Sequence, residues 1–314
     1  MARMVKVSAL APRPHVMNPH KDMNVCVDEM ISFWDENLKQ VLYDRPDLIV
    51  LPEACDRPPH FTKEQLDAYY AARGERILDH FKEIAKTYQC NIAYSAARIL
   101  PDGTRRNSTQ FINRRGEIDG IYNKNHLTHG EYYESHILYG KDAPIIETDF
   151  GKVAGAICFD LNFKELLEKY ERLKPELIVF SSMYHGGLMQ NYWAYACRSY
   201  FIGCVSDDQC TVINPMGDLV AQSTNYFSYL VTDINLDYAV VHIDYNRGKF
   251  QSIKEKYGSK VKIYDPGHVG SVLMTSETDD FSIHDVISEF EIETWDEYYA
   301  RSLSERHMPG HIEP

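Results

Sequence analysis

The sequence predicts an α/β protein in which parallel strands are covered by helices. Stretches with apolar residues at helical spacing alternate with short apolar runs of strand length, and this alternation is typical of βαβ units. One of the runs, "DLIVLPE" at residues 47–53, shows no polar alternation, as expected of a strand buried on both faces. The chain has 314 residues, of which 44% are hydrophobic, so it can bury one large core or two modest ones.

Each expected element rests on a local pattern. The run at 4–10 has the length of a strand, and from Met23 to Val41 apolar residues recur at helical spacing. The turn signals "PDG" and "RRG" separate three short strands in the middle of the chain. In order, we expect strands at 4–10, 47–53, 91–100, 108–115, 116–122, 152–158 and 177–182, helices from about 23, over about 62–88, over 162–173 and near 187–202, and two or three strands that end near residue 243.

An internal similarity links residues 45–54 with residues 174–183. The segments "RPDLIVLPEA" and "KPELIVFSSM" share a basic residue, a proline, an acidic residue and an apolar strand, and each follows a helix. A duplicated α–β unit would explain the similarity. Coincidence would also explain it, because proline, an acid and an apolar run commonly link a helix to a strand. The sequence leaves both explanations open.

Composition changes toward the C-terminus, and we expect one large domain at 1–245 and an extension at 246–314. Residues 264–272 have the composition of a loop. Residues 282–306 predict an acidic amphipathic helix, which would pack on its own domain or on a neighbouring subunit. Its apolar residues available for burial are Val286, Ile287, Phe290, Ile292 and Trp295.

Charge and targeting signals exclude several classes of partner. The formal net charge of −13 disfavours nucleic acids and anionic membranes. The N-terminal segment lacks the apolar core of a signal peptide, and no apolar run has the roughly 20 residues of a membrane-spanning helix. We therefore expect a cytoplasmic protein. The seven cysteines include no CxxC pair, which argues against a zinc ribbon or a disulfide framework.

Three reactive residues stand at the ends of expected strands. Glu53 ends the run at 47–53, Lys124 follows the strand that ends at 122, and Cys158 ends the strand that begins at 152. Sites in open α/β sheets assemble outside the carboxyl ends of strands, so we expect these residues to meet. A thiol nucleophile, a base and a fixed cation suffice for acyl transfer. Taken singly, each residue also fits a structural role, and a cysteine at a strand end is more often core than catalytic.

The surroundings of these residues favour the catalytic interpretation. In chain order, "LPEA", "YNKNHL" with "GEYYE", and "GAICFDLNFKE" resemble the nitrilase superfamily of carbon–nitrogen hydrolases. "YGKDAPIIETDFGKVAG", "NYWAYACRSYFIGCV" and "NPMGDLV" are similar to further motifs of that family, and the resemblance covers roughly residues 4–245. It implies a four-layer α-β-β-α sandwich and a homo-oligomer, either a dimer or a larger assembly.

The resemblance also implies roles for individual residues. Cys158 would be the nucleophile, Glu53 the general base and acid, and Lys124 the group that stabilises the oxyanion. A fourth polar residue is implied in the loop after the lysine, for which Glu131 is the best match and Glu134 the rival. Asp160 is expected to fix the turn after the cysteine. No metal or organic cofactor has a role in this chemistry, although His126 and His129 form a weak metal-like pair.

The substrate class follows from smaller details. "Cys-Phe-Asp" is closer to the amidase and carbamoyl-hydrolase branches than to the Cys-Trp-Glu of true nitrilases, so we expect cleavage of a small amide or N-carbamoyl compound. Nitrilase and N-acyltransferase activities are the alternatives within the superfamily. Asn162 and Lys164 stand where the family often has Arg and Pro, which leaves the branch open. Candidate residues for contact with the substrate are Tyr132, Phe159, Tyr184, His185 and Trp193.

Two hypotheses from other classes complete the analysis. One is a Cys–His hydrolase of another fold, with His129 or His185 as the base. The other is a catalytically silent binding protein on the same scaffold, although retention of Glu53, Lys124 and Cys158 together argues against it.

Overall fold

The chain forms two compact units in the computed structural model, which describes residues 1–313. One unit contains Val5–Ile234, and the other joins the first four residues to the chain from Asn235 onward. The sequence placed the boundary at residue 245, about ten residues later. The difference arises because β13 (Tyr238–His242) pairs with β15 (Ser271–Ser276) in the sheet of the second unit, a pairing that has no local sequence signal.

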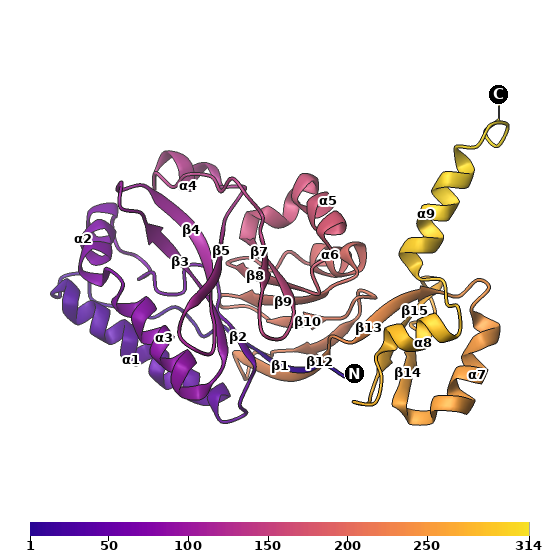
Figure 1. Cartoon of the computed structure of the whole chain (residues 1–314). Helices are drawn as coiled ribbons and strands as arrows, with labels where there is room; N and C mark the ends of the chain where they lie inside the picture. Colours follow the sequence, from indigo (N-terminus) through magenta and orange to yellow (C-terminus); the bar gives the residue numbers. More distant parts are fainter. Residues whose placement is uncertain (314) are drawn as a thin grey trace. The chain divides into compact units, whose positions relative to one another are not determined.

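The first unit contains two six-stranded mixed sheets (Figure 1). In spatial order the first sheet consists of β12 (Tyr229–Asn235), β1 (Met4–Leu10), β2 (Leu48–Val50), β3 (Asn91–Ile99), β4 (Arg105–Ile112) and β5 (Ile118–Asn123). The second consists of β11 (Leu219–Gln222), β10 (Thr211–Ile213), β9 (Tyr200–Val205), β8 (Leu177–Ser182), β7 (Lys152–Ile157) and β6 (Ile145–Glu147).

The two sheets repeat one strand order. β1, β2 and β3 run parallel and are followed by antiparallel β4 and β5. β7, β8 and β9 run parallel and are followed by antiparallel β10 and β11. The similar segments at 45–54 and 174–183 contain or lead into β2 and β8, which hold the same place in their sheets. The matching order favours duplication over coincidence.

Helices cover the outer face of each sheet, which gives the expected four layers of helix, sheet, sheet and helix. In Figure 1 the helices α1, α2 and α3 lie beside the first sheet, and α5 and α6 lie beside the second. The bounds are α1 (Met23–Leu42), α2 (Lys63–Arg73), α3 (Arg76–Tyr88), α4 (His129–Tyr133), α5 (Lys164–Leu173) and α6 (Leu188–Cys197), with a short 3-10 helix η1 (Cys158–Asn162) after β7.

Helix α1 shows why these sequences form outer helices. Asp22 accepts a hydrogen bond from the main-chain N–H of Asn24 at 2.9 Å and so caps the first turn. Val27, Trp34 and Leu38 lie on one stripe of the helix and are buried against the sheet. The amphipathic spacing seen in the sequence therefore reports the face that packs on the core.

Two expected helices differ from the structure. Gly74 divides the expected helix at 62–88 into α2 and α3. Its φ of +47° is a conformation that glycine adopts readily and that other residues rarely adopt. The helix near 187–202 ends at residue 197, because Arg198 adopts the left-handed conformation and the following apolar run forms β9. A short apolar run is ambiguous between helix and strand, and here burial on both faces makes it a strand.

The two sheets pack closely against each other. Ser181 on β8 donates a hydrogen bond to the carbonyl of Leu51 beyond β2 at 2.8 Å. A Cβ atom at Gly155 on β7 would lie 2.7 Å from the Cβ of Tyr122 on β5, so only glycine fits this contact. The glycine in "VAGAIC" therefore allows the strand that carries Cys158 to approach the opposite sheet.

The second unit has a three-stranded sheet with the order β13, β15, β14 (Val261–Tyr264), and three helices. The helices are α7 (Arg247–Tyr257), α8 (Ile283–Glu289) and α9 (Trp295–Arg306), with a 3-10 turn η2 (Gly258–Lys260). Val286, Ile287 and Ile292 are buried in the core of this unit. The prediction of a single helix at 282–306 is wrong, because Ser282 and Thr294 each begin a separate helix with a capping box.

Within residues 1–313, none of the helices combines the length and the apolar character needed to cross a membrane.

Candidate active site

The three reactive residues predicted from strand ends line one cavity of about 200 Å³ in the first unit. Glu53 follows β2 and Lys124 directly follows β5, so both come from the first sheet. Cys158 directly follows β7 of the second sheet. The cavity therefore lies where the ends of strands from both sheets meet, as expected for sites in α/β proteins.

A buried network of charges holds the base and the cation together. The Lys124 side chain is 1% exposed, and its ammonium donates to Glu53 Oε1 at 2.9 Å. It also donates to both carboxylate oxygens of Glu131, at 2.9 and 2.8 Å. The side-chain amide of Asn107 donates to Glu53 Oε1 at 2.7 Å and to Glu131 Oε1 at 2.9 Å. Each buried charge is thus paired and hydrogen-bonded, which offsets much of the cost of removing it from water.

Local structure decides between the two candidates for the fourth polar residue. Glu131 belongs to a capping box at the start of α4, where its Oε2 accepts from the main-chain N–H of Thr128 at 2.8 Å. This contact turns the carboxylate toward Lys124. Glu134 is exposed at the end of the same helix and does not line the cavity. The geometry therefore favours Glu131.

Cys158 is held in a constrained turn. Its φ is +46°, a conformation that non-glycine residues rarely adopt and that often marks functional positions. The fully buried Asp160 maintains the turn, since it accepts from the main-chain N–H of Ile157 at 3.0 Å and from the Tyr122 hydroxyl at 2.7 Å. Asp160 also accepts from the main-chain N–H of His126 at 2.8 Å. The expected role of Asp160 in fixing the turn agrees with these contacts.

Electrostatics keep the thiol protonated in the resting protein. Burial, followed by the negative charge of Glu53, raises the pKa of Cys158 to about 11, against a smaller lowering effect of Lys124. Burial opposes the charge of Lys124, but Glu53 and Glu131 outweigh it and raise the pKa of the ammonium. Burial also opposes ionisation of Glu131, but the charge and hydrogen bonds of Lys124 lower the pKa of that carboxyl. The site therefore contains a neutral thiol beside an ion-paired base.

One oxygen of Glu53 remains available to accept a proton. Oε1 accepts from Lys124 and Asn107, whereas no N–H or O–H group among residues 1–313 donates to the buried Oε2. The carboxylate nevertheless lies close enough to the Cys158 thiol to raise its pKa by charge and hydrogen bonding. This arrangement suits a base that takes a proton from the thiol.

Most of the residues proposed for substrate contact do not line this cavity. Trp193 is fully buried and packs edge-on against Tyr170, so its assignment to a substrate pocket is corrected to a core role. Trp193 belongs to the inward face of α6, which the amphipathic pattern alone did not distinguish from a pocket. The remaining four candidates, Tyr132, Phe159, Tyr184 and His185, are also absent from the lining residues.

Their surroundings explain where these side chains lie. Tyr132 is 39% exposed and contacts Tyr139. The Tyr184 hydroxyl accepts from the side-chain amide of Asn162 at 3.0 Å, and His185 accepts from the main-chain N–H of Gly187 at 3.2 Å. Neither His185 nor His129 lines the cavity, so the geometry gives Cys158 a carboxylate rather than an imidazole as its neighbour.

Sequence reasoning missed several residues of the cavity. The most important is Asn107, which bridges the two carboxylates from the middle of β4 and has no motif around it. The other lining residues that the sequence did not single out are Ala54, Arg57, Tyr70, Ala97, Thr128, Ser135, Ile137 and Met183.

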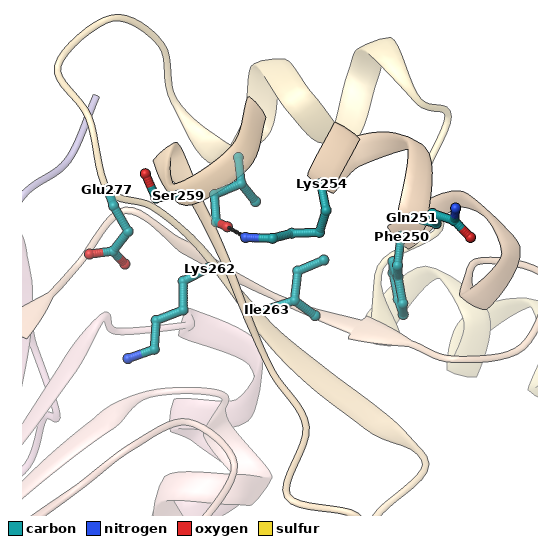
Figure 2. A pocket seen from close by; sticks show the side chains of 8 residues that line it. Phe250, Gln251, Lys254, Ser259, Lys262, Ile263 and Glu277 are labelled. Atoms are coloured by element: carbon teal, nitrogen blue, oxygen red, sulfur yellow. Dashed lines mark hydrogen bonds between the residues drawn. The ribbon is translucent and has the colours of Figure 1, made fainter. Parts of the chain in front are cut away.

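A second cavity, of about 550 Å³, lies on the C-terminal unit (Figure 2). Figure 2 shows Lys254 of α7 pointing across it toward β14, where its ammonium donates to the carbonyl of Val261 at 2.6 Å. The same ammonium donates to the carbonyl of Gly258 at 2.6 Å and so caps the end of the helix. The lining residues include no cysteine, so this cavity offers no thiol nucleophile.

Within residues 1–313, no group of three or more His, Cys, Asp or Glu side chains is arranged to hold a metal ion. His126 lies between Asp160 and Glu165, with its two ring nitrogens 2.9 and 2.7 Å from their oxygens.

Comparison with known proteins identifies the class to which this fold and site belong. The model of the carbon–nitrogen hydrolase family matches residues 24–241, more than half of the chain, so the chain belongs to this family and to the nitrilase superfamily. The resemblance of its motifs predicted this membership. The chain is accordingly a carbon–nitrogen hydrolase, and the fold is that of the nitrilase superfamily.

Individual relatives are distant. The chain is 25% identical over 216 residues to the "hydrolase in agr operon" of Staphylococcus lugdunensis, across 63% of this chain and 91% of that protein. A carbon–nitrogen hydrolase from Helicobacter pylori G27 has a similar structure, with a TM-score of 0.62, 16% identity and coverage of 81% of this chain and 93% of that one. A mutant amidase from Nesterenkonia sp. AN1, with acrylamide added at its active-site cysteine, has a TM-score of 0.59, 14% identity and coverage of 81% and 99%.

Proposed function

We propose that this protein hydrolyses a non-peptide C–N bond of a small amide or N-carbamoyl compound through a thioester on Cys158. The observation that carries the proposal is the Glu53 carboxylate, which lines one cavity with Cys158, accepts from the Lys124 ammonium at 2.9 Å and lies close enough to the thiol to raise its pKa. The cavity of about 200 Å³ supports a small substrate. Membership of the carbon–nitrogen hydrolase family supports the reaction class.

The first half of the reaction transfers the acyl group to the protein. Glu53 takes the proton from the Cys158 thiol as the sulfur attacks the carbonyl carbon, which becomes tetrahedral. The Lys124 ammonium stabilises the negative charge that develops on the carbonyl oxygen, an effect typically worth about 3–4 kcal/mol in such sites. Glu53 then gives its proton to the departing nitrogen. The C–N bond breaks, ammonia or an amine leaves, and a thioester remains on Cys158.

The second half regenerates the thiol. Glu53 takes a proton from a water molecule, whose oxygen attacks the thioester carbonyl, and Lys124 again stabilises the oxyanion. The C–S bond breaks, the carboxylic or carbamic acid leaves, and the sulfur recovers its proton from Glu53. Glu131 and Asn107 keep Glu53 and Lys124 in position through both halves, because each contacts the network without reaching the thiol.

The test is release of ammonia from a panel of primary amides, N-carbamoyl amino acids and nitriles. We expect the wild type to act on amides or N-carbamoyl compounds and Cys158→Ala to be inactive. Cys55→Ala is the matched control, because Cys55 is also a half-buried free cysteine but does not line the catalytic cavity. Silence of the wild type across the panel, or activity in Cys158→Ala, contradicts the proposal.

The same assay separates the alternatives. A response confined to nitriles indicates a nitrilase, and formation of a new amide with an added amine in preference to hydrolysis indicates an acyltransferase. Substantial activity in Glu53→Gln favours a Cys–His hydrolase. Binding of an amide without turnover indicates a silent relative. Assembly as a homo-oligomer and location in the cytoplasm remain predictions, and light scattering of the purified protein tests the former.

A further inference from the structure

The loop after β2 places an arginine at the catalytic cavity without giving it an acidic partner. Arg57 stands four residues after Glu53, is exposed and lines the same cavity. Its Nη2 lies 3.2 Å from the thioether sulfur of Met183, which is a weak acceptor. Among residues 1–313 no carboxylate lies within ion-pair distance of Arg57. Its planar set of N–H donors is therefore available to a ligand.

A second arginine, Arg73 at the end of α2, shows what a structural role at this loop looks like. Arg73 is buried, donates to Asp56 Oδ2 at 2.9 Å and donates to the carbonyl of Ala97 at 2.7 Å. The contact with Asp56 fixes the loop that carries Glu53 and Arg57, and the contact with Ala97 joins Arg73 to β3. Arg57 makes no such contact, so stabilisation of the fold does not account for its guanidinium.

With Lys124 assigned to the developing oxyanion, the charges of the cavity leave Arg57 as the group suited to a second negative group on the substrate. In the resting protein the three N–H donors of Lys124 have acceptors on Glu53 Oε1 and on both oxygens of Glu131. Two carboxylates against one ammonium give the inner cavity a negative balance. A substrate with a negative group would be repelled there, whereas at Arg57 it meets a positive charge that pairs with carboxylates through two parallel hydrogen bonds.

In space, one residue, Met183, lies between Arg57 and the proposed nucleophile Cys158. Met183 lines the same cavity as Cys158, its main chain acts to lower the pKa of the thiol, and its side chain contacts Arg57. The hydroxyl-bearing ring of Tyr70 also lines the cavity, and the charge of Arg57 acts on its phenol. No residue among 1–313 hydrogen-bonds the Tyr70 hydroxyl, so it offers a second donor near the guanidinium.

We propose that Arg57 is a specificity-determining residue that binds a carboxylate on the substrate, so that the preferred substrates are short acidic amides or N-carbamoyl acids. This inference rests on the proposed function, and it names the substrate class of the same site. The cavity has a volume of about 200 Å³, and Met183 alone lies between Arg57 and Cys158. The substrate therefore needs a short chain between its carboxylate and the carbonyl that is attacked.

The test compares two substrates of equal chain length. Succinamate carries a terminal carboxylate where butyramide carries a methyl group. We expect the wild type to prefer succinamate, and Arg57→Gln to lower kcat/KM for succinamate about 10- to 100-fold more than for butyramide, as expected for loss of a charge-assisted hydrogen bond. The change should fall mainly on KM, because the carboxylate contact is the same in the ground state and the transition state. Arg57→Lys should restore part of the preference.

The control is Arg172→Gln, which removes the same charge from an exposed position on α5. A substrate preference unchanged by Arg57→Gln, or changed equally by Arg172→Gln, overturns the inference. Calorimetric titration of succinamate into the inactive Cys158→Ala protein decides the case in which neither amide is cleaved. Binding weakened 10- to 100-fold by adding Arg57→Gln supports the inference even if the proposed hydrolysis fails. No binding, or binding independent of Arg57, overturns it.

Discussion

Glu53→Gln is expected to stop turnover and at the same time to make Cys158 easier to alkylate. In the wild type, burial and the charge of Glu53 raise the pKa of Cys158 to about 11, while Lys124 acts in the opposite direction. Replacing the carboxylate by an amide of the same shape removes the charge that raises the pKa and leaves the ammonium that lowers it. The pKa of the thiol therefore falls, and the base needed for catalysis is lost.

The size of the effect follows from the pKa. At pH 8, three pH units below a pKa of about 11, roughly one thiol in a thousand is ionised, against roughly one in ten for a thiol at its ordinary value of 9.0. The more basic thiolate is intrinsically about tenfold more nucleophilic over two pKa units, which offsets part of this difference. Wild-type Cys158 should therefore react with iodoacetamide about tenfold more slowly than an ordinary exposed thiol.

Mass spectrometry of the peptide that contains Cys158, after timed alkylation between pH 6 and pH 11, measures this directly. We expect the rate profile of Glu53→Gln to move to lower pH and its rate at pH 8 to exceed that of the wild type, while amide turnover disappears. Glu134→Gln, which removes an exposed carboxylate outside the cavity, should leave both unchanged. A wild-type profile centred at or below pH 8.5, or slower alkylation of Glu53→Gln at every pH, would refute the electrostatic account.

Three further predictions concern the groups around the thiol. Lys124→Met leaves the buried Glu53 and the half-buried Glu131 without a counter-charge. The free energy of unfolding measured in urea should fall by about 3–5 kcal/mol and turnover should be lost, whereas an unchanged stability would contradict the network. Asn107→Leu removes the amide that donates to both carboxylates, and kcat should fall roughly 10- to 100-fold with less change in KM. Burial opposes protonation of His126, but its hydrogen bonds to Asp160 and a second carboxylate raise its pKa. The stabilisation that protonated His126 gives the folded state is therefore complete below the unfolded-state pKa of about 6.5. It is lost as the pH rises through the higher pKa of the folded state. The unfolding temperature of the wild type should fall over this pH range, whereas that of His126→Gln should not. Parallel dependence on pH in the two proteins would contradict the prediction.

Much of the site was predictable because its reactive side chains stand at the ends of strands and within recognisable motifs. Glu53, Lys124 and Cys158 each follow a strand, and the structure brings all three to one cavity. Asn107 was not predictable from a single sequence, because it lies within β4 and an isolated asparagine has no pattern that distinguishes it. Its importance appears only when β4 is placed beside β3 and β5.

The parts of the fold that the sequence misplaced have a common physical cause. The apolar run that forms β9 has the composition of a buried helix segment, and only its pairing with β8 settles the conformation. Trp193 has the large aromatic side chain expected in a substrate pocket, and the packing of α6 buries it instead. β13 belongs to the second unit because of strand pairing across some thirty residues. In each case a long-range contact overrides the local pattern.

The proposed nucleophile and its proposed base stand on opposite sheets, and this has a consequence for how the protein matures. Glu53 and Lys124 follow strands of the first sheet, Cys158 follows a strand of the second, and the contact of Gly155 with Tyr122 sets how closely the two approach. A chain in which only one half has folded has a thiol without its base, or a base without its thiol. Recovery of activity during refolding should therefore lag behind recovery of helical circular dichroism and coincide with docking of the halves. We therefore expect the protein to gain its chemistry only when the two sheets dock.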